Sequence, residues 1–372
     1  MPEQHLHIIS FDIPFPANYG GVIDVFFKAK SLTEHGIKVH LHCFEYNRKR
    51  IPELDKMFHQ VNYYKRDVSR KNLFKSVPYI VSSRVSEELI ENLSKDNYPI
   101  LMEGLHTSAL LEDERLENRK KVVRTHNIEH EYYHHLAKAE SDIFKKYYYY
   151  NESAKLKRYE VTLEKADNLI AISENDKKYF SSEYDNVVFI PAFHPFKEVS
   201  IKEGRGEYVL YHGNLSVAEN INAVKYLVNN VFDNSKFKFK IAGLNPSRQI
   251  IKAVAGVESI ELISNPSDEE LQTLIENAHI NISITAQATG LKLKLLNTLY
   301  NGRFCLVNDK MLSGTNLDKL CIIANDNGGL KRKINTLFKK EFTRKEIEKR
   351  KLILTTLYNN GNNTKKLIDL VC

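Results

Sequence analysis

The sequence predicts an α/β protein of two domains, each a parallel sheet with helices on both faces. Short apolar runs of strand length alternate with segments of helical periodicity along nearly the whole chain. The alternation starts afresh after a polar loop at residues 193–207. The chain has 372 residues, enough for two cores. We therefore expect two domains joined by one linker.

Composition excludes several other classes of protein. Hydrophobic residues make up 42% and charged residues 27%, which is ordinary for a globular protein and unlike a disordered or collagen-like chain. No apolar run approaches the roughly 18 residues that a membrane span needs, and the first residues lead directly into a strand, so we expect no signal peptide. The 4 cysteines show no disulfide or metal spacing. We expect a cytoplasmic protein.

The net charge of +7 is concentrated at the C-terminus. Residues 331–372 contain 12 Lys and Arg but 4 Asp and Glu, so the rest of the chain is nearly neutral. A solvated helix face explains this run, and contact with an anionic membrane is the alternative. The lysines and tyrosines at residues 145–158 could also contact an anionic membrane, and the alternative is that the tyrosines face the core. No zinc-finger spacing or RNA-binding aromatic motif is present, so we expect no nucleic-acid partner.

The first domain begins with a strand–helix–strand unit. Residues 6–10 and 37–44 are apolar strands, and the helix between them, 22–36, has apolar residues at helical spacing and ends at Gly36, where a helix commonly stops. Apolar runs then predict further strands at 98–104, 120–127 and 168–173. Residues 140–166 contain no helix breaker and predict one long helix.

The second domain repeats this alternation. Apolar runs predict its strands and helical spacing predicts the helices between them. The strands are expected at 208–213, 237–243, 259–264, 280–286, 303–309 and 320–326, and the helices at 220–232, 268–278 and 290–302. Because right-handed crossovers connect parallel strands, helices should cover both faces of the sheet. A ligand cleft between the two domains is the default expectation.

Two glycine-containing loops are candidate anion sites. In the first, Gly20 and Gly21 begin a helix whose free N–H groups and dipole would favour a phosphate or a sugar hydroxyl. A tight turn explains this pair equally well. In the second, Gly290 precedes a helix start that carries Lys292 and Lys294. A lysine there is unfavourable unless an anion is bound, although either side chain could instead point to water.

Two histidines follow predicted strands directly, His106 after residues 98–104 and His126 after Arg124 and Thr125. The carboxyl ends of strands in open α/β sheets are where ligands bind, so a functional role competes evenly with a structural one. Glu103, Glu129 and Arg124 share these strand ends, and could hold the imidazoles or bind sugar hydroxyls.

The chain resembles retaining GT-B glycosyltransferases of the family 4 type over nearly its whole length. The matching segments are PFPANYGG, EGLHT, RTHNIE, ADNLIAISENDKKYF with VVFIPAF, YHGNLSVAENINAVKYL, TGLKLKLLNTLYNG and KMLSGTNL. The resemblance implies two Rossmann-like domains and an interdomain cleft. Residues 1–195 would be the acceptor-side domain, 196–350 the nucleotide-sugar domain, and 351–372 a C-terminal helix that packs back on the first domain.

The resemblance also implies roles for individual residues. A nucleotide-diphosphate sugar would bind the second domain, and no metal or other cofactor is expected. His106 and Lys294 would be the catalytic residues, and the acceptor would lie near His126, Asn127 and Glu129. The donor would contact Gly20, Gly21, Gly213, Asn214, Thr289, Gly290, Leu291, Lys292 and Asn297, with the base and ribose near Ser264 and Asn265.

This sequence departs from the family pattern in two respects. A basic pair is typical after the first strand of the second domain, where this chain has Asn214 and Asn220. Family members commonly carry two glutamates eight positions apart, where this chain has Thr289 and Asn297. The resemblance favours a hexosyltransferase that acts on a glycan or lipid-linked acceptor in surface polysaccharide synthesis, in the cytoplasm or at the inner face of the membrane. Two alternatives stay open: a sugar-nucleotide epimerase, and a nucleotide-sugar binding protein with weak or no catalysis.

Overall fold

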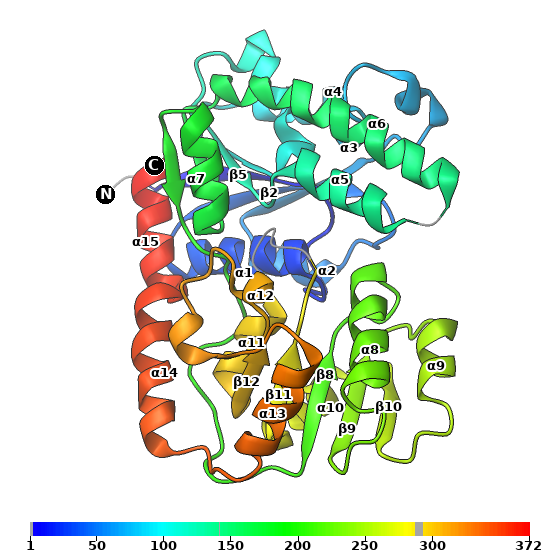
Figure 1. Ribbon diagram of the computed structural model, residues 1–372. Coiled ribbons are helices and arrows are strands. Elements are labelled where there is room, and N and C mark those ends of the chain that lie inside the picture. Colours follow the sequence, from blue (N-terminus) through cyan, green and yellow to red (C-terminus); the bar gives the residue numbers. More distant parts are fainter. Residues whose placement is uncertain (1–2, 141, 287–292) are drawn as a thin grey trace. The chain divides into compact units, whose positions relative to one another are not determined.

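The computed structural model describes residues 3–140, 142–286 and 293–372, which form two compact units (Figure 1). The first unit contains the described chain up to Pro195 together with Tyr358–Cys372. The second contains the described residues from Phe196 to Leu357. Each unit is a parallel sheet with helices packed on it, so the predicted fold class is confirmed.

Seven strands among the described residues form the sheet of the first unit, in the order β3-β2-β1-β4-β5-β6-β7. They are β1 (His5–Ser10), β2 (Lys38–Glu45), β3 (Gln60–Lys65), β4 (Ile100–Glu103), β5 (Lys121–Thr125), β6 (Asn168–Ala171) and β7 (Val187–Phe189). Because β1 pairs with both β2 and β4, the winding direction changes between β1 and β4. Ligands bind open α/β sheets at the carboxyl ends of the strands at such a point.

The helices of the first unit follow the strands in the expected alternation. They are α1 (Gly20–Glu34), α2 (Pro52–Met57), α3 (Tyr79–Ser82), α4 (Glu87–Leu93), α5 (Glu129–Ala139), α6 (Ile143–Tyr159), α7 (Glu174–Glu183) and α15 (Asn360–Val371). Helix α1 buries Val25, Ala29 and Leu32, and the chain leaves it through Gly36 at φ +89, as the sequence predicts. The helix expected over 140–166 is shorter: α6 ends at Tyr159 and a 3-10 helix, Glu160–Lys165, follows.

Successive residues of the buried strands point to opposite faces of the first sheet. On one face Leu6 and Ile8 of β1 pack with helix α1 and with Leu367 of α15. On the other face Ile9 packs with residues of α3, α4 and α6. Both faces are therefore covered, which explains why these strands read as nearly continuous apolar runs.

Six strands among the described residues form the sheet of the second unit, in the order β10-β9-β8-β11-β12-β13. They are β8 (Tyr208–His212), β9 (Lys238–Gly243), β10 (Ile260–Ser264), β11 (Ile280–Ser283), β12 (Phe304–Val307) and β13 (Ile322–Ile323). The helices are α8 (Ala218–Asn230), α9 (Arg248–Val254), α10 (Asp268–Asn277), α11 (Leu293–Asn301), α12 (Asp309–Leu312), α13 (Asn327–Leu337) and α14 (Arg344–Leu357). The winding direction changes between β8 and β11, at the position equivalent to β1 and β4.

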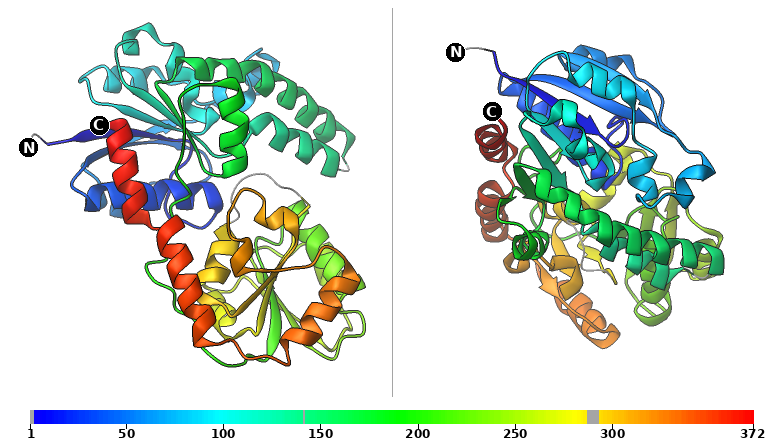
Figure 2. Two further views of the ribbon diagram at one scale, coloured as in Figure 1. Left: turned by 60° about the vertical axis from the view of Figure 1, so that its left-hand side comes forward. Right: turned by 90° about the horizontal axis from the view of Figure 1, so that it is seen from above.

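The C-terminal segment consists of two helices, where the sequence predicts one from residue 351. Helix α14 belongs to the second unit, and its buried Arg350 donates hydrogen bonds to carbonyl groups that include that of Leu299. Helix α15 belongs to the first unit and packs beside α1 (Figure 2). There the hydroxyls of Thr364 and Ser31 are hydrogen bonded at 2.6 Å.

Candidate functional site

The carboxyl ends of β4 and β5 bring His106 and His126 together with Phe11, which follows β1. Gly104, at φ +69, turns the chain from β4 into a 3-10 helix, Leu105–Glu112, that carries His106. The ring of Phe11 lies 5.2 Å from that of His106 and 5.4 Å from that of His126, measured between centroids. Phe11 was not among the residues predicted from the sequence.

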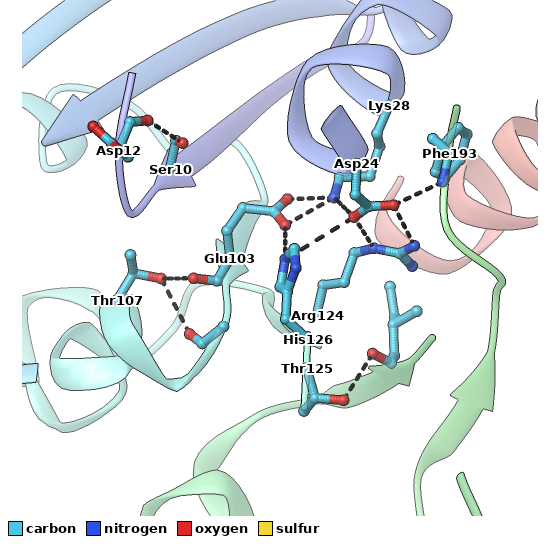
Figure 3. Close-up of polar contacts among 12 residues, drawn as sticks. Ser10, Asp12, Asp24, Lys28, Glu103, Thr107, Arg124, Thr125, His126 and Phe193 are labelled. Atoms are coloured by element: carbon cyan, nitrogen blue, oxygen red, sulfur yellow. Dashed lines mark hydrogen bonds and ion pairs between the residues drawn. The ribbon is translucent and has the colours of Figure 1, made fainter. Parts of the chain in front are cut away.

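His126 belongs to a buried network of charged side chains (Figure 3). Glu103 accepts a hydrogen bond from His126 Nε2 at 2.9 Å and one from Lys28 Nζ at 2.8 Å. Lys28 also donates to Asp24 at 3.1 Å, and Arg124 donates two hydrogen bonds to Asp24, at 2.7 and 2.8 Å. All five side chains are buried. Glu103 thus holds the imidazole of His126, which is one of the two roles expected for Glu103 from the sequence.

The charges within this network balance one another. Burial alone would raise the pKa of Asp24, but the nearby charges of Arg124 and Lys28 outweigh it and hold that pKa far below its ordinary value. Burial also opposes ionisation of Glu103, and the charge of Lys28 outweighs that effect and lowers its pKa. Two carboxylates therefore face two permanent cations.

The network also excludes two roles for its members. Asp24, Glu103 and His126 place ligand atoms within 4.8 Å of one another, but a metal ion there would meet the charges of Lys28 and Arg124. Arg124 is fully buried and also donates to the carbonyl of Pro191 at 3.0 Å. The expectation that Arg124 binds an imidazole or a sugar hydroxyl is therefore wrong, because its donors hold Asp24 and the main chain.

His106 is half-buried, and its Nδ1 is buried without a hydrogen-bond partner among the described residues. Burial lowers the pKa of His106 well below its ordinary value, and the charge of Arg84 adds to this effect. His106 is therefore neutral at pH 7. A neutral imidazole offers one donor and one acceptor, which suits a sugar hydroxyl.

The glycine pair at the start of α1 has two different explanations. A Cβ on Gly21 would lie 2.7 Å from the ring of Phe11, so this glycine is required for packing. Gly20 is exposed, and a Cβ on it would meet no heavy atom within 4 Å. Helix α1 has no side-chain cap at Tyr19 and no acidic residue in its first turn. Its first N–H groups thus have no side-chain acceptor at the cap position.

Glu129 lies at the start of α5 and is buried. Burial raises its pKa to about 7, although a hydrogen bond with Asn127 partly opposes the rise. Its Oε1 atom has no hydrogen-bond partner in the described part of the chain. Nearby, the buried guanidinium of Arg84 donates to the carbonyl groups of Phe11 and Ile80, at 2.8 and 2.7 Å. Glu129 is thus a carboxyl group that changes charge near neutral pH.

In the second unit, the loop after β8 holds Gly213 and Asn214 against β9. A Cβ on Gly243 would lie 1.7 Å from the carbonyl oxygen of Gly213, so only glycine at position 243 allows this approach. Asn214 Oδ1 accepts hydrogen bonds from the N–H and the hydroxyl of Ser216. These contacts fix the loop at the point where the winding direction changes.

Lys294 points toward this loop from α11. Its Nζ donates to Asn220 Oδ1 of α8 at 3.0 Å and lies 3.5 Å from the hydroxyl of Tyr211. Asn220 Nδ2 in turn donates to the carbonyl of Asn214 at 2.9 Å. Burial and the charge of Lys294 lower the pKa of His212 to about 3. The structure thus joins Lys294, predicted from one motif, to Asn214, predicted from another.

The other described residues that were predicted to bind the nucleotide sugar lie on β10, after it, and on α11. Asn265 follows β10 at φ +52, and its Oδ1 accepts from the N–H of Asn245 at 2.7 Å. Asn297 is half-buried on α11 and accepts from Asn301 at 2.9 Å. Ser264 is the exposed last residue of β10. Thr289, Gly290, Leu291 and Lys292 lie outside the described residues.

Sequence reasoning missed Asp24, Lys28 and Arg84. For the first two a signal was present, because they lie four positions apart on the face of α1 that also carries the buried Val25 and Leu32. Charged residues on a buried helix face must have partners. Arg84 follows α3, and no pattern in the sequence marks it.

None of the helices in the described ranges combines the length and the apolarity that a membrane span requires.

Comparisons with known proteins identify the architecture. No family model matches the chain. The uncharacterized 44.6 kDa protein in the cps region of Klebsiella pneumoniae is 30% identical over 340 residues, which cover 86% of this chain and 87% of that protein. Among solved structures, a mutant of S. aureus TarM in complex with fondaparinux, alpha-GlcNAc-glycerol and UDP gives a TM-score of 0.68 at 13% identity, with 99% of each chain covered.

A second solved structure has the same architecture. The UDP-forming alpha,alpha-trehalose-phosphate synthase from Burkholderia xenovorans, in complex with glucose-6-phosphate, gives a TM-score of 0.65 at 12% identity. The match covers 98% of this chain and 99% of that one. These similarities show that the chain has the GT-B fold of such transferases.

Proposed function

We propose that this chain, which belongs to the same protein family as the cps-region protein of Klebsiella pneumoniae, is a glycosyltransferase. It transfers a hexose from a nucleotide-diphosphate sugar to a glycan or lipid-linked acceptor. Because a fold hosts many functions, the proposal rests on the residues at the strand ends rather than on the fold. The nucleotide sugar binds the second unit, and the acceptor binds the first.

The observation that carries the proposal is the position of Lys294. Its ammonium group lies beside Asn220, which contacts the loop after β8. This is the sheet edge at which α/β domains bind nucleotides. An ammonium group there is suited to a diphosphate, because the charge that develops on the leaving group during C–O cleavage needs a fixed cation. The mechanism that we propose uses Lys294 for this purpose and requires no metal ion.

The first unit supplies the groups that bind sugar hydroxyls. His106 is neutral, so its ring offers one donor and one acceptor, and His126 is oriented by Glu103. Asn127 and Glu129 lie at the same strand end and offer further polar atoms. The acceptor hydroxyl attacks on the face from which the nucleotide leaves, so the sugar keeps its anomeric configuration.

We propose UDP-sugars as the first donors to test, because UDP is bound in the TarM complex and is the product named for the trehalose-phosphate synthase. A thermal-shift screen of UDP-, GDP- and ADP-sugars identifies the donor, since a ligand of the folded state raises the melting temperature. Incubation of that donor with and without a mixture of glycan acceptors then separates the activities.

Each outcome of that incubation has one interpretation. Sugar transfer that depends on the acceptor supports the proposal. Release of free sugar or of an epimer without an acceptor indicates the epimerase alternative. Binding without turnover across a broad panel indicates a nucleotide-sugar binding protein.

For the acceptor we favour a lipid-linked glycan of surface polysaccharide synthesis, reached from the cytoplasmic side of the membrane. Helix α6 supports this proposal because Ile143, Phe144 and Tyr147 are 74%, 83% and 76% exposed. Lys145 and Lys146 lie among these apolar side chains, a combination that suits an anionic membrane surface. Flotation with anionic liposomes at low salt should carry the protein upward, and Phe144→Ser should weaken it. No flotation at low salt would exclude membrane contact.

A further inference from the structure

One face of the first sheet carries two rows of histidines. His5 and His7 lie on β1, and His40 and His42 lie on β2. The strands pair in parallel, with His7 opposite His40. Because side chains alternate along a strand, all four histidines share the face on which Ile9 packs. The rows occupy the part of that face toward the amino ends of the strands.

The row that contains His7 and His42 is part of a continuous series of hydrogen bonds that runs from Asn92 to Asp96. Asn92 donates to the hydroxyl of Tyr64, which lies 2.8 Å from His42 Nδ1. His42 Nε2 lies 2.8 Å from His7 Nδ1, and His7 Nε2 lies 3.0 Å from a carboxylate oxygen of Asp96. Every ring nitrogen of this pair has a partner. The row is therefore a satisfied structural network.

The row that contains His5 and His40 is different because His59 joins it from the segment between α2 and β3. His5 Nδ1 lies 2.9 Å from His40 Nε2. The ring of His59 lies 5.4 Å from that of His5 and 4.9 Å from that of His40, between centroids. One ring nitrogen of each histidine lies within 4.8 Å of the others. Within the described residues, His59 forms no hydrogen bond through its ring.

The contact with Gln60 determines which ring nitrogen of His40 carries the proton. Gln60 Nε2 is directed to Asn62 Oδ1, which turns Gln60 Oε1 toward His40 Nδ1 at 3.2 Å. Since an amide oxygen only accepts, His40 Nδ1 carries the proton and Nε2 presents a lone pair to the cluster. Metal-binding histidines commonly have this second hydrogen bond, which orients the ligating nitrogen.

We propose that His5, His40 and His59 bind a divalent transition-metal ion of the Zn²⁺ type. Imidazole nitrogens suit such ions, and metal–nitrogen distances of about 2.0–2.1 Å place ligand atoms about 3.3 Å apart in a tetrahedron. The 2.9 Å between His5 and His40 requires only a small opening. Rotation of the exposed His59 brings in the third ligand, and a water completes the coordination.

This site is separate from the proposed transfer chemistry. His5 begins β1, whereas His106 and His126 follow the carboxyl ends of β4 and β5, at the opposite edge of the same sheet. The ion would connect β1 and β2 with the segment before β3. Its role would be to stabilise the first unit, because metal that binds only the folded chain adds its binding free energy to folding.

The test uses the full chain without an affinity tag, stripped of metal with a chelator. Titration with Co²⁺ should give about one equivalent of a four- or five-coordinate visible spectrum, and Zn²⁺ should displace it and raise the melting temperature. His59→Ala should weaken Co²⁺ binding at least about 10-fold and remove the thermal shift, because one of three ligands is lost. His59 is exposed, so this variant should fold like the unchanged chain.

Two matched variants keep the result specific. His35→Ala, at the end of α1, and His134→Ala, on α5, remove histidines that lie outside the cluster and should bind Co²⁺ like the unchanged chain. The proposal is overturned if His59→Ala binds Co²⁺ as tightly as the unchanged chain. It is also overturned if His134→Ala abolishes binding, or if no saturable binding occurs.

Discussion

Arg124 holds Asp24 through two parallel hydrogen bonds inside the first unit. Arg124 Nε and its terminal nitrogen lie 2.7 and 2.8 Å from the two carboxylate oxygens, and both side chains are buried. Asp24 lies on α1 and Arg124 on β5, so the pair connects two elements far apart in the sequence. Asp24 Oδ1, one of the two oxygens in this bidentate contact, also accepts a hydrogen bond from the N–H of Phe193 at 2.7 Å.

Asp24→Ala should strongly destabilise the protein. The change leaves the charges of Arg124 and Lys28 buried with fewer partners, which costs about 3–5 kcal/mol when a buried pair is broken. Urea unfolding of Asp24→Ala and of the unchanged protein measures the difference in their free energies of unfolding. Asp233→Ala removes an exposed partner of Lys331 and should leave the transition nearly unchanged. Equal effects of the two substitutions would contradict the assigned role of the network.

Glu129 should make stability fall as the pH rises from about 4.5 to about 7. Its pKa in the folded protein is about 7, above the ordinary value of 4.5, so between these values the folded state binds more protons than the unfolded state. Stability is therefore highest below the unfolded pKa and is lost through this window, by up to about 3 kcal/mol. Other groups, such as His106 and His212, have a pH dependence of their own. The loss is therefore measured as the difference in free energy of unfolding between the unchanged protein and a variant without this carboxyl group, at pH 5 and at pH 8.

Glu129→Gln should abolish most of that loss, because the amide does not ionise. The expected result is a variant more stable than the unchanged protein at pH 8 and similar to it at pH 5. Glu183→Gln, at the exposed end of α7, is the matched control and should keep the original pH dependence. The same pH dependence in Glu129→Gln and the unchanged protein would show that Glu129 ionises freely.

Gly104→Ala should disturb the position of His106. Residue 104 has φ +69, which strains any L side chain, and the added Cβ would lie 2.8 Å from His106 Nδ1. Gly36→Ala is the matched control, because Gly36 also has a positive φ, +89, but a Cβ there meets nothing within 4 Å. Both should lose about 1–2 kcal/mol of stability from backbone strain. Only Gly104→Ala should also lower transfer activity; equal activities would argue against His106.

Most of the fold was predictable because buried parallel strands are nearly all apolar. The runs at 6–10 and 37–44 became β1 and β2, and those at 208–213 and 237–243 became β8 and β9. The strand β3 was missed because its residues Gln60–Lys65 are half polar, which suits a strand at the edge of a sheet. The polar residues of β3 interrupt the continuous apolar pattern that identifies the central strands.

The candidate sites were predictable where a residue follows a strand or lies at a helix start after a glycine-containing loop. His106 and His126 were found in the first way, whereas Asn214 was indicated only by the family resemblance. The network partner Lys28 was missed because its charge lies on a helix and its partner Glu103 is distant in sequence. Pairing across such distances depends on strand order, which periodicity does not encode.

Lys294→Ala should lower kcat/KM for transfer by about 100- to 1000-fold, as expected when a group that stabilises leaving-group charge is removed. The fold should persist, since Lys294 is only half-buried and its partners Asn220 and Tyr211 keep their own hydrogen bond at 2.8 Å. Lys252→Ala, on the exposed face of α9, removes the same charge from the second unit away from this cluster and should leave kcat/KM unchanged. Steady-state rates with the donor from the thermal-shift screen make the comparison. Because uniform binding affects KM alone, a loss confined to kcat identifies Lys294 as acting on the transition state. An unaltered rate in Lys294→Ala would remove its assigned role.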